Sequence, residues 1–402
     1  MRMSKKKEIV PKFRFPEFQR DGIDFVHGNK LFKSITNKNH NSDLPILAIT
    51  QDQGAVPRDQ IEYNVTVTDK SLSNYKVVEV GDFIISLRSF QGGIEYSRFK
   101  GICSPAYIIL RKREENISEL YYKYFFKTWR YIQSLNRNLE GIRDGKMISY
   151  SQFSSVKVPY PRSFKEQQKI ADCLSSIDEL IDAENRKLKA LEKYKKGLMQ
   201  KLFPAEGKTL PEWKFPEFRG KSEWRIKPLG KICTNYDSRR IPITEKDRVK
   251  GEIPYIGASG VIDYINDFIF DEDLLCVSED GANLVARTYP IAFSISEKTW
   301  VNNHAHVLKF SHKYTQDIVE SYLNMINLQD FLTGMAQPKL NRAKLDIIPI
   351  PLPEEEEQQK IAGCLSDVDT MITEQSNKVE QLKTHKKGLM QGLFPSLEEA
   401  DV

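Results

Sequence analysis

Apolar residues recur at alternating spacings of four and three along two stretches of the chain, residues 170–202 and 361–393. Such a heptad stripe is typical of a long helix whose apolar seam is covered by another helix. Polar residues interrupt both stripes at matching positions, which are Glu184 and Lys195, and Gln375 and Lys386. A helix over residues 166–203 is about 57 Å long at 1.5 Å per residue. We therefore predict two long helices, and each is the obvious partner of the other.

The two stripes belong to an internal repeat. The sequence Glu-Gln-Gln-Lys-Ile-Ala at residues 166–171 returns at residues 357–362, and both copies end in Leu-Phe-Pro. More than half of the aligned helical positions are identical. The stretches before the two copies share little beyond a Phe-Pro-Glu-Phe opening at residues 15–18 and 215–218. This pattern predicts two similar helices that follow two dissimilar globular regions.

Each globular region has β character. Runs rich in Val, Ile and aromatic residues are bounded by Gly, Asn, Asp or Pro, which is typical of strands joined by loops. These runs are residues 45–49, 77–87 and 107–110 in the first half, and 254–256, 268–277 and 305–310 in the second. Residues 119–135 and 315–331 carry apolar positions at helical spacing. The predicted fold class is α+β, with two α/β-mixed domains related by a pseudo-twofold repeat.

A Pro-x-Pro step precedes each long helix, because proline favours extended backbone and cannot continue a helix. The steps mark the boundaries of four predicted parts. These are a first domain at residues 1–160, a first long helix at 161–204, a second domain at 205–350, and a second long helix with a C-terminal tail at 351–402. Antiparallel pairing of the helices places Glu184 near Gln375 as a polar layer, and the long connection also allows parallel pairing.

The helical copies also agree at positions outside the apolar seam. A coiled coil needs only its seam, so we predict that the shared outer positions dock two copies of one partner. Each repeated glycine costs about 1 kcal/mol of helix stability relative to alanine unless another backbone approaches closely. Recent duplication alone would explain the identities, but the globular regions have diverged almost beyond alignment. The predicted docking residues are Glu166, Gln168, Lys169, Lys196, Gly197, Met199 and Gln200, with their copies Glu357, Gln359, Lys360, Lys387, Gly388, Met390 and Gln391.

The composition is compatible with a polyanionic partner without establishing one. The 402 residues carry a formal charge of +5, and the pI is near 8.7. Five cysteines lie far apart with no CxxC motif, as expected in a reducing cytosol. No run of about eighteen apolar residues is present. We expect a soluble cytoplasmic protein with no membrane segment.

No pattern of catalytic residues stands out. Two Gly-Lys-Thr/Ser sequences resemble the end of a phosphate-binding loop, but Leu202 and Phe215 stand where such a loop needs its first glycine. His304 and His306 lie on one side of a predicted strand without an evident third metal ligand. We therefore expect no catalytic residue, no metal and no cofactor in this chain, which recognises rather than reacts.

Three features together resemble the DNA specificity (S) subunit of type I restriction-modification enzymes. They are the paired Glu-Gln-Gln-Lys-Ile-Ala helices that each follow a Pro-x-Pro step, the Leu-Phe-Pro ends of these helices, and the two unlike domains. Smaller phrases at residues 101–107 and 301–308 are also similar to that family. The resemblance covers essentially the whole chain. It implies two target recognition domains separated by two long helices that form an antiparallel coiled coil. Each domain would read one half of a bipartite, asymmetric site in double-stranded DNA.

The resemblance also implies partners. Two methylase (M) subunits would dock on the long helices, bind S-adenosylmethionine and methylate adenine at N6. Two restriction (R) subunits would add DNA translocation and cleavage that depend on ATP and Mg²⁺. The chain itself would then be a non-catalytic subunit whose helices act as a ruler for the unread spacer.

Polar residues on the loops after the predicted strands are candidates for DNA contact, since hydrogen-bonding side chains read base edges and Arg and Lys bind phosphates. In the first domain the candidates are Thr50, Gln51, Arg88, Ser89, Gln91, Gly92, Gly93, Tyr96, Arg98, Lys100 and Lys146. In the second domain they are Ser259, Ser278, Glu279, Asn283, Arg287, Asn302, Asn303, His304 and Lys339. Lys146 and Lys339 are favoured for phosphate, and Glu279 or Asp280 for a cytosine amino group. For each residue an ordinary solvated turn is the alternative.

Two other functions stay open at this point. A self-sufficient enzyme would both recognise and modify DNA, and methyl transfer from labelled S-adenosylmethionine by the chain alone would reveal it. A coiled-coil scaffold or anti-restriction decoy would lack sequence preference, and selection from a random duplex pool would reveal that.

Overall fold

The computed structural model describes residues 10–41, 43–61, 72–137, 148–334 and 337–395. The chain divides into two compact units, where unit 1 is residues 1–184 with 378–402 and unit 2 is residues 185–377. Two 39-residue helices, α7 (Phe164–Leu202) and α11 (Glu355–Leu393), each have one end in either unit. Both predicted long helices are thereby confirmed. None of the described helices is long and apolar enough to span a lipid bilayer.

The globular part of unit 1 combines short strands with short helices. In chain order these are β1 (Ile23–His27), α1 (Gly28–Leu31), β2 (Phe32–Ile35), β3 (Leu47–Thr50), β4 (Gly54–Pro57), β5 (Lys76–Val78), β6 (Phe83–Ile85), α3 (Ser89–Gly92), β7 (Glu95–Tyr96), β8 (Gly101–Cys103), β9 (Ile108–Lys112), α4 (Glu119–Phe125), α5 (Trp129–Arg137), α6 (Tyr150–Ser155) and β10 (Lys157–Pro161). A four-stranded antiparallel sheet has the order β2-β9-β6-β7, and β1-β10, β3-β4 and β5-β8 form two-stranded pairs. Phe32, Phe83, Tyr122 and Phe126 pack edge to face in its core.

The globular part of unit 2 also combines short strands with short helices, but its strands pair in a different order. Its elements are β11 (Arg225–Pro228), β12 (Thr234–Asn235), β13 (Lys250–Gly257), β14 (Gly260–Ile265), β15 (Leu274–Ser278), α8 (Asn283–Ala286), β16 (Ala292–Ile295), β17 (Trp300–Val301), β18 (Ala305–Lys309), α9 (Lys313–Met325), α10 (Arg342–Asp346) and β19 (Pro349–Leu352). The sheet orders are β12-β18-β15-β16 and β14-β13-β17, and β11 pairs with β19. The α+β class and the pseudo-twofold repeat are confirmed.

Several predicted elements are shorter in the structure than in the sequence analysis. The helix predicted over residues 119–135 is broken into α4 and α5, because the Thr128 hydroxyl donates to the Phe125 carbonyl oxygen and ends the first helix. The strand predicted over residues 77–87 is interrupted at Gly81, whose φ of 93° suits a turn. Part of the run at 268–277 is acidic, and only its end forms β15.

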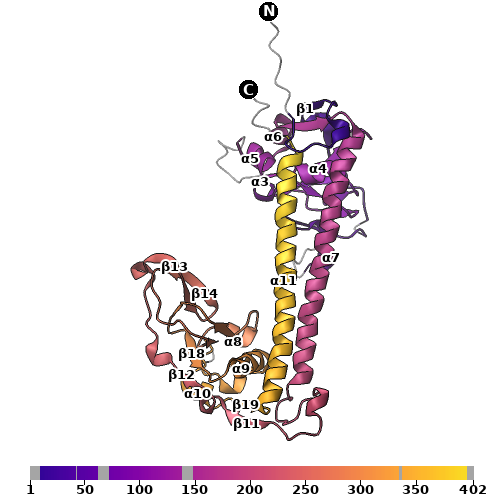
Figure 1. Ribbon diagram of the computed structural model, residues 1–402. Helices are drawn as coiled ribbons and strands as arrows, with labels where there is room; N and C mark the ends of the chain where they lie inside the picture. Colours follow the sequence, from indigo (N-terminus) through magenta and orange to yellow (C-terminus); the bar gives the residue numbers. More distant parts are fainter. Residues whose placement is uncertain (1–9, 42, 62–71, 138–147, 335–336, 396–402) are drawn as a thin grey trace, which may run out of the picture. The chain divides into compact units, whose positions relative to one another are not determined.

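The long helices pair antiparallel (Figure 1), because in each unit the beginning of one lies beside the end of the other. In unit 1 the Lys386 ammonium lies 2.5 Å from the Asp178 carboxylate. In unit 2 the equivalent residues of the repeat, Lys195 and Asp369, are also 2.5 Å apart. The polar interruptions at Lys195 and Lys386 are therefore ion pairs between helices. The interruption at Glu184 binds Lys378, 2.5 Å away.

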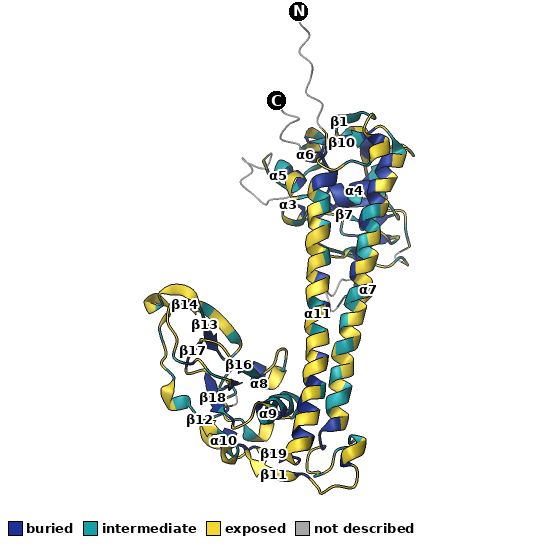
Figure 2. Cartoon of the chain, viewed as in Figure 1, coloured by how far each residue is buried: buried dark blue, intermediate teal, exposed yellow. Residues whose placement is uncertain are grey.

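Apolar residues at the helix ends join the globular cores. In unit 1 Ile170 and Leu174 of α7 share a buried cluster with Leu393 of α11 and with α4. In unit 2 Leu202 shares a cluster with Ile361 and with residues of α9. Figure 2 shows buried residues concentrated at these ends, whereas much of the middle of both helices is exposed.

The repeated Phe-Pro-Glu-Phe sequence belongs to a segment that binds both helices. We call residues 13–18 and 213–218 the opening segments. In unit 1 the Arg14 guanidinium donates to both carboxylate oxygens of Glu166 at 2.7 and 2.9 Å, and both side chains are buried. The Phe13 amide donates to the Gly392 carbonyl oxygen near the end of α11. The opening segment thus ties the start of α7 to the end of α11.

Unit 2 repeats this arrangement. The Lys214 ammonium lies 3.3 Å from the Glu357 carboxylate at the start of α11. The Trp213 amide donates to the Lys201 carbonyl oxygen near the end of α7. A second ion pair, between Glu217 and Lys360, completes the contact. The corresponding pair in unit 1 joins Glu17 and Lys169.

The repeated glutamines also have equivalent partners. The Gln167 amide donates to the Pro161 carbonyl oxygen and accepts from the Ser118 amide at the start of α4. The Gln358 amide donates to the Pro353 carbonyl oxygen and accepts from the Thr315 hydroxyl in α9. Each glutamine therefore joins the Pro-x-Pro step to a helix of its own globular domain.

We predict that replacing Arg14 by methionine lowers the free energy of unfolding by about 3 to 5 kcal/mol, because the buried Glu166 carboxylate loses its counterion. Denaturation in urea measures the loss. The control is Lys221→Met, since the Lys221–Glu356 pair is exposed and spans 3.6 Å. That change should cost less than about 1 kcal/mol. Equal losses would contradict a structural role for the opening segment.

A second prediction concerns Asp178. Burial alone would raise the pKa of Asp178, but hydrogen bonds from Lys386 and Tyr124 outweigh burial and hold the pKa below the ordinary 3.8. Asp178→Asn should therefore cost roughly 1 to 2 kcal/mol near neutral pH, and the cost should shrink as the pH falls below 3.8, where the wild-type carboxylate also gains a proton. Asp369→Asn, at the more exposed equivalent position, should cost less. The free energy of unfolding of the wild type and the variant is measured as a function of pH. A cost of Asp178→Asn that did not change with pH would contradict a lowered pKa of Asp178.

Candidate nucleic-acid interface

Two of the predicted DNA-contacting loops of unit 1, residues 50–54 and 88–93, lie against each other. The Gln51 amide donates to the Arg88 carbonyl oxygen at 3.4 Å. The Lys127 ammonium donates to the carbonyl oxygens of Gln51 and Gly92 at 3.1 and 3.0 Å. Lys127 therefore holds both loops in place through hydrogen bonds to their backbone.

Lys127 is held by a buried carboxylate. It forms an ion pair with Glu95, whose side chain is almost fully buried. Burial raises the pKa of Glu95 to about 7, and burial also lowers the pKa of Lys127. The Glu95 Oε2 atom has no hydrogen-bond partner among the described residues. The sequence analysis missed this pair, because a lysine in the turn between α4 and α5, 32 residues beyond a strand glutamate, carries no local signal.

The predicted residues of unit 1 divide into exposed and internal sets. Those exposed to solvent are Gln51, Arg88, Gln91, Arg98 and Lys100, and Lys100 pairs with Glu79. Thr50, Gly92 and Tyr96 are half-buried. The prediction is wrong for Ser89, whose hydroxyl is buried and accepts from the Ser86 amide, and for Gly93, whose buried backbone packs on Phe126. Lys146 lies outside the described residues.

In unit 2 the predicted loops also gather at one place. The Ser278 hydroxyl donates to the Ala258 carbonyl oxygen in the β13–β14 turn at 2.6 Å. The Glu279 amide donates to the His304 carbonyl oxygen, and the Leu340 amide donates to the Glu279 carbonyl oxygen. The loops at residues 257–260, 278–283, 302–304 and 337–340 are thus joined through the end of β15.

The structure corrects four predictions in unit 2. Ser278, Asn283 and Asn302 are buried and hydrogen-bonded within the domain, so they cannot reach a base. The Arg287 guanidinium donates to the carbonyl oxygens of Leu323 and Ile326 at the end of α9, and burial lowers its pKa. Each of these residues positions a loop and does not face outward.

Five predicted residues of unit 2 remain near the surface. Ser259, Asn303, His304 and Lys339 are exposed. Glu279 is half-buried, and its carboxylate lies between Arg240 at 2.8 Å and Lys339 at 3.2 Å. These ion pairs hold the pKa of Glu279 below its ordinary value although burial acts in the opposite direction. Glu279 is thus already engaged by its own domain.

The histidines considered as metal ligands have separate partners. His304 Nδ1 lies 2.8 Å from Asp280 at the surface. His306 Nδ1 lies 2.6 Å from Asp237 in the interior. Asp237 and Arg240 were not among the sequence candidates, and His306 was considered only as a metal ligand, since it lies 69 residues along the chain from Asp237.

Two grooves are lined by the repeated ends of the long helices. Groove 1, in unit 1, has a volume of about 950 Å³ and lies between the end of α11 and α5. Groove 2, in unit 2, has a volume of about 670 Å³ and lies between the end of α7 and α9. Predicted docking residues line both, namely Lys387, Met390 and Gln391 in groove 1 and Lys196, Met199 and Gln200 in groove 2. The repeat therefore places the same side chains in two equivalent grooves.

The other predicted docking residues fall into three groups. Glu166 and Glu357 are buried in the ion pairs with the opening segments, so the docking prediction is wrong for them. Lys169 and Lys360 are exposed and paired with Glu17 and Glu217, and Gln168 and Gln359 are exposed. At Gly197 and Gly388 an added Cβ atom would meet nothing within 4 Å. Among the residues that the structure describes, no close approach explains these two glycines.

Comparison with known proteins identifies the family. The family model described as type I restriction modification DNA specificity domain matches residues 21–193 and 221–383. A putative type I restriction enzyme specificity subunit of Haemophilus influenzae is 33% identical over 153 residues, which are 38% of this chain and 39% of that protein. The type I restriction enzyme MjaVIII specificity subunit of Methanocaldococcus jannaschii is 25% identical over 351 residues, covering 81% of this chain and 80% of that protein.

Solved structures show the same fold. The crystal structure of the type I restriction-modification S subunit from M. genitalium matches with a TM-score of 0.60 at 15% identity, covering 96% of this chain and 99% of that chain. A structure that describes complex assembly and conformational transition of the type I system matches with a TM-score of 0.57 at 14% identity. Because the family model covers most of the sequence in two copies, the chain belongs to the type I restriction-modification DNA specificity family.

Proposed function

We propose that this chain is the non-catalytic DNA-reading subunit of a type I restriction-modification complex. The globular domain of each unit reads one half of a bipartite, asymmetric site in double-stranded DNA. The observation that carries this proposal is the attachment of two unlike loop clusters to the long helices by equivalent opening segments. Equivalent attachment with unlike loops is what a reader of two different half-sites needs.

The exposed residues of the two clusters support different readout. The first cluster offers guanidinium and amide groups from Arg88, Gln91 and Arg98. The second offers Asn303, His304 and Lys339. Arginine pairs well with guanine, and glutamine or asparagine with adenine, while lysine also binds phosphate. Different side chains at the two surfaces imply different half-site sequences.

The long helices serve two purposes in this proposal. They set the length of the unread spacer, and they bind two M subunits at groove 1 and groove 2. The M subunits supply S-adenosylmethionine and adenine methylation. Two R subunits supply cleavage with ATP and Mg²⁺. The repeated Lys, Met and Gln side chains in both grooves support two copies of one partner.

Sequencing of methylated DNA from cells that express the chain with its M subunit tests DNA reading. We expect two short motifs separated by a fixed gap. Exchanging residues 20–155 for the same region of another specificity subunit should change one motif and preserve the other, because the second loop cluster lies wholly in unit 2. Methylation without a fixed gap, or a change in both motifs, would argue for a single reading surface. Methyl transfer by the chain alone would favour a self-sufficient enzyme.

The repeated glycines Gly197 and Gly388 provide a test of docking. Gly197→Ala and Gly388→Ala should each raise the free energy of unfolding of the isolated chain by about 1 kcal/mol, because alanine favours helix and nothing obstructs its Cβ atom. The same changes should weaken binding of the M subunit about tenfold, since an added methyl group separates closely packed backbones. Titration calorimetry measures the affinity.

Gly363→Ala is the matched control for this experiment. Gly363 is exposed in α11, an added Cβ atom there meets nothing within 4 Å, and this glycine is not repeated in α7, where Asp172 stands at the equivalent position. This variant should gain helix stability and keep its affinity for the M subunit. Unchanged affinity in the Gly197 and Gly388 variants would show that the partner does not approach these glycines.

A further inference from the structure

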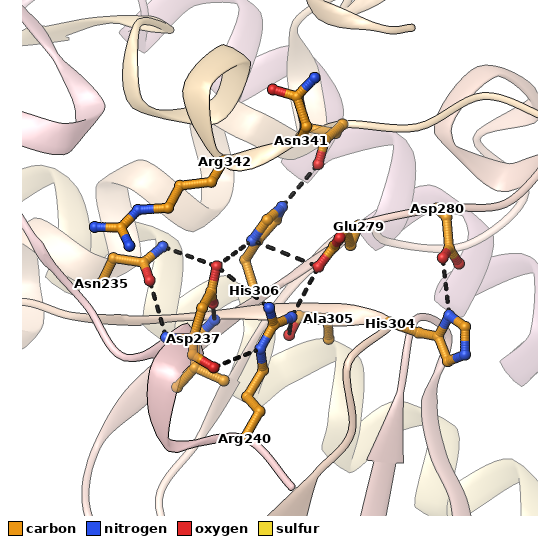
Figure 3. Close-up of polar contacts among 12 residues, drawn as sticks. Asn235, Asp237, Arg240, Glu279, Asp280, His304, Ala305, His306, Asn341 and Arg342 are labelled. Atoms are coloured by element: carbon orange, nitrogen blue, oxygen red, sulfur yellow. Dashed lines mark hydrogen bonds and ion pairs between the residues drawn. The ribbon is translucent and has the colours of Figure 1, made fainter. Parts of the chain in front are cut away.

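A cluster of charged side chains lies beneath the predicted reading loops of unit 2 (Figure 3). Its members are Asp237, Arg240, Glu279 and His306, which Figure 3 labels. Lys339 joins them through its ion pair with Glu279. The His306 side chain is 1% exposed, and Asp237, Arg240 and Glu279 are each less than 15% exposed. Lys339, at the outer edge, is about half exposed. The cluster therefore connects the interior of the domain to the surface proposed to face DNA.

Both ring nitrogens of His306 lie close to hydrogen-bonding oxygens. Its Nε2 atom lies 2.7 Å from the Leu340 carbonyl oxygen, which can only accept a hydrogen bond. Its Nδ1 atom lies 2.6 Å from the Asp237 carboxylate. Burial acts against ionisation of Asp237, but the hydrogen bond with His306 outweighs it and holds the pKa of Asp237 below its ordinary value. A ring that carries a proton on both nitrogens would donate to both of these acceptors.

The cluster joins segments that are distant in sequence. The Arg240 guanidinium donates to the Glu279 carboxylate at 2.8 Å and to the Ala305 carbonyl oxygen at 2.7 Å. The other Glu279 oxygen lies 3.2 Å from the Lys339 ammonium. His306 links β18 to the loop at Leu340 and, through Asp237, to the loop after β12. Three loops and a strand are fixed by directional contacts at one point.

Stability alone is a weak reason for such a cluster. Burial of charged groups carries a large desolvation cost, and well-packed apolar side chains often stabilise a domain equally well. Charged hydrogen bonds differ from apolar contacts because they impose direction as well as distance. The buried Glu95–Lys127 pair takes the corresponding place beneath the loops of unit 1. Both domains thus place buried charge directly under the loops.

We propose that His306 is a positioning residue for recognition of the half-site read by unit 2. As an imidazolium it holds Asp237 and the Leu340 carbonyl oxygen in fixed places, and thereby orients the loops that carry Lys339, Asp280 and His304. This proposal rests on the proposed function. His306 itself does not touch DNA, since its side chain is buried.

The charge of His306 is tested without DNA. Nitrogen-15 spectra of the full chain with labelled histidine, assigned by comparison with His306→Gln, should show both ring nitrogens of His306 protonated near neutral pH. A neutral tautomer would overturn the proposal. This measurement does not depend on DNA recognition, so it fails or succeeds separately from the proposed function.

The positioning role is tested in the complex with the M subunit. The double variant Asp237→Asn with His306→Gln removes the cation and its counterion together, so that no unpaired buried charge remains. It should melt close to the wild type, yet discriminate against mismatches in its own half-site about tenfold less well. Discrimination at the other half-site should stay unchanged. The control is His312→Gln, which replaces an exposed histidine of the same unit outside the cluster.

The outcomes separate positioning from folding. Relaxed discrimination at one half-site with an unchanged melting temperature supports the proposal. Unchanged discrimination, or equal relaxation at both half-sites, overturns it. The single variant His306→Gln leaves the Asp237 charge unpaired. It should lose both thermal stability and discrimination. A wild-type complex without two half-sites would contradict the proposed function and leave the protonation result standing.

Discussion

The apolar seams of α7 and α11 are the constraint on which the rest of the structure depends. At both ends each seam is buried against the end of the other helix together with the globular domain of that unit. Antiparallel pairing brings the start of one helix beside the end of the other in both units. One opening segment can then bind both helices at once, as Arg14 with Phe13 and Lys214 with Trp213 do. The repeat is thus required by the geometry of the pairing.

The same constraint explains most of the identity between the helical copies. Glu166, Gln167 and Lys169 recur because each binds a partner within its own unit, and the partner recurs as well. The identities at the other ends of the helices have a different character. Met199 and Met390 line grooves, and Gly197 and Gly388 have open space around them. The contacts described within the units account for the first set but not for the second.

The sequence predicted the long helices closely because a heptad stripe is a local pattern. It also predicted which loops would be candidates for DNA contact, since these polar loops follow buried strands. It could not tell outward from inward side chains within those loops. Arg287 is a polar loop residue by sequence, yet its guanidinium donates to the Leu323 carbonyl oxygen, 36 residues along the chain. Contacts of that kind follow from tertiary structure alone.

The buried charges explain how the two domains could diverge while their attachment stayed the same. The opening segments and the repeated glutamines fix each domain to the helices. The loops take no part in this attachment, so their sequences can differ. The loops are fixed from beneath instead, by Lys127 and Glu95 in unit 1 and by the His306 cluster in unit 2. These two solutions share no residues and no spacing. Each domain therefore has its own buried residues that hold its loops in place. The outward side chains of the loops can change while these buried contacts keep the shape of the loops.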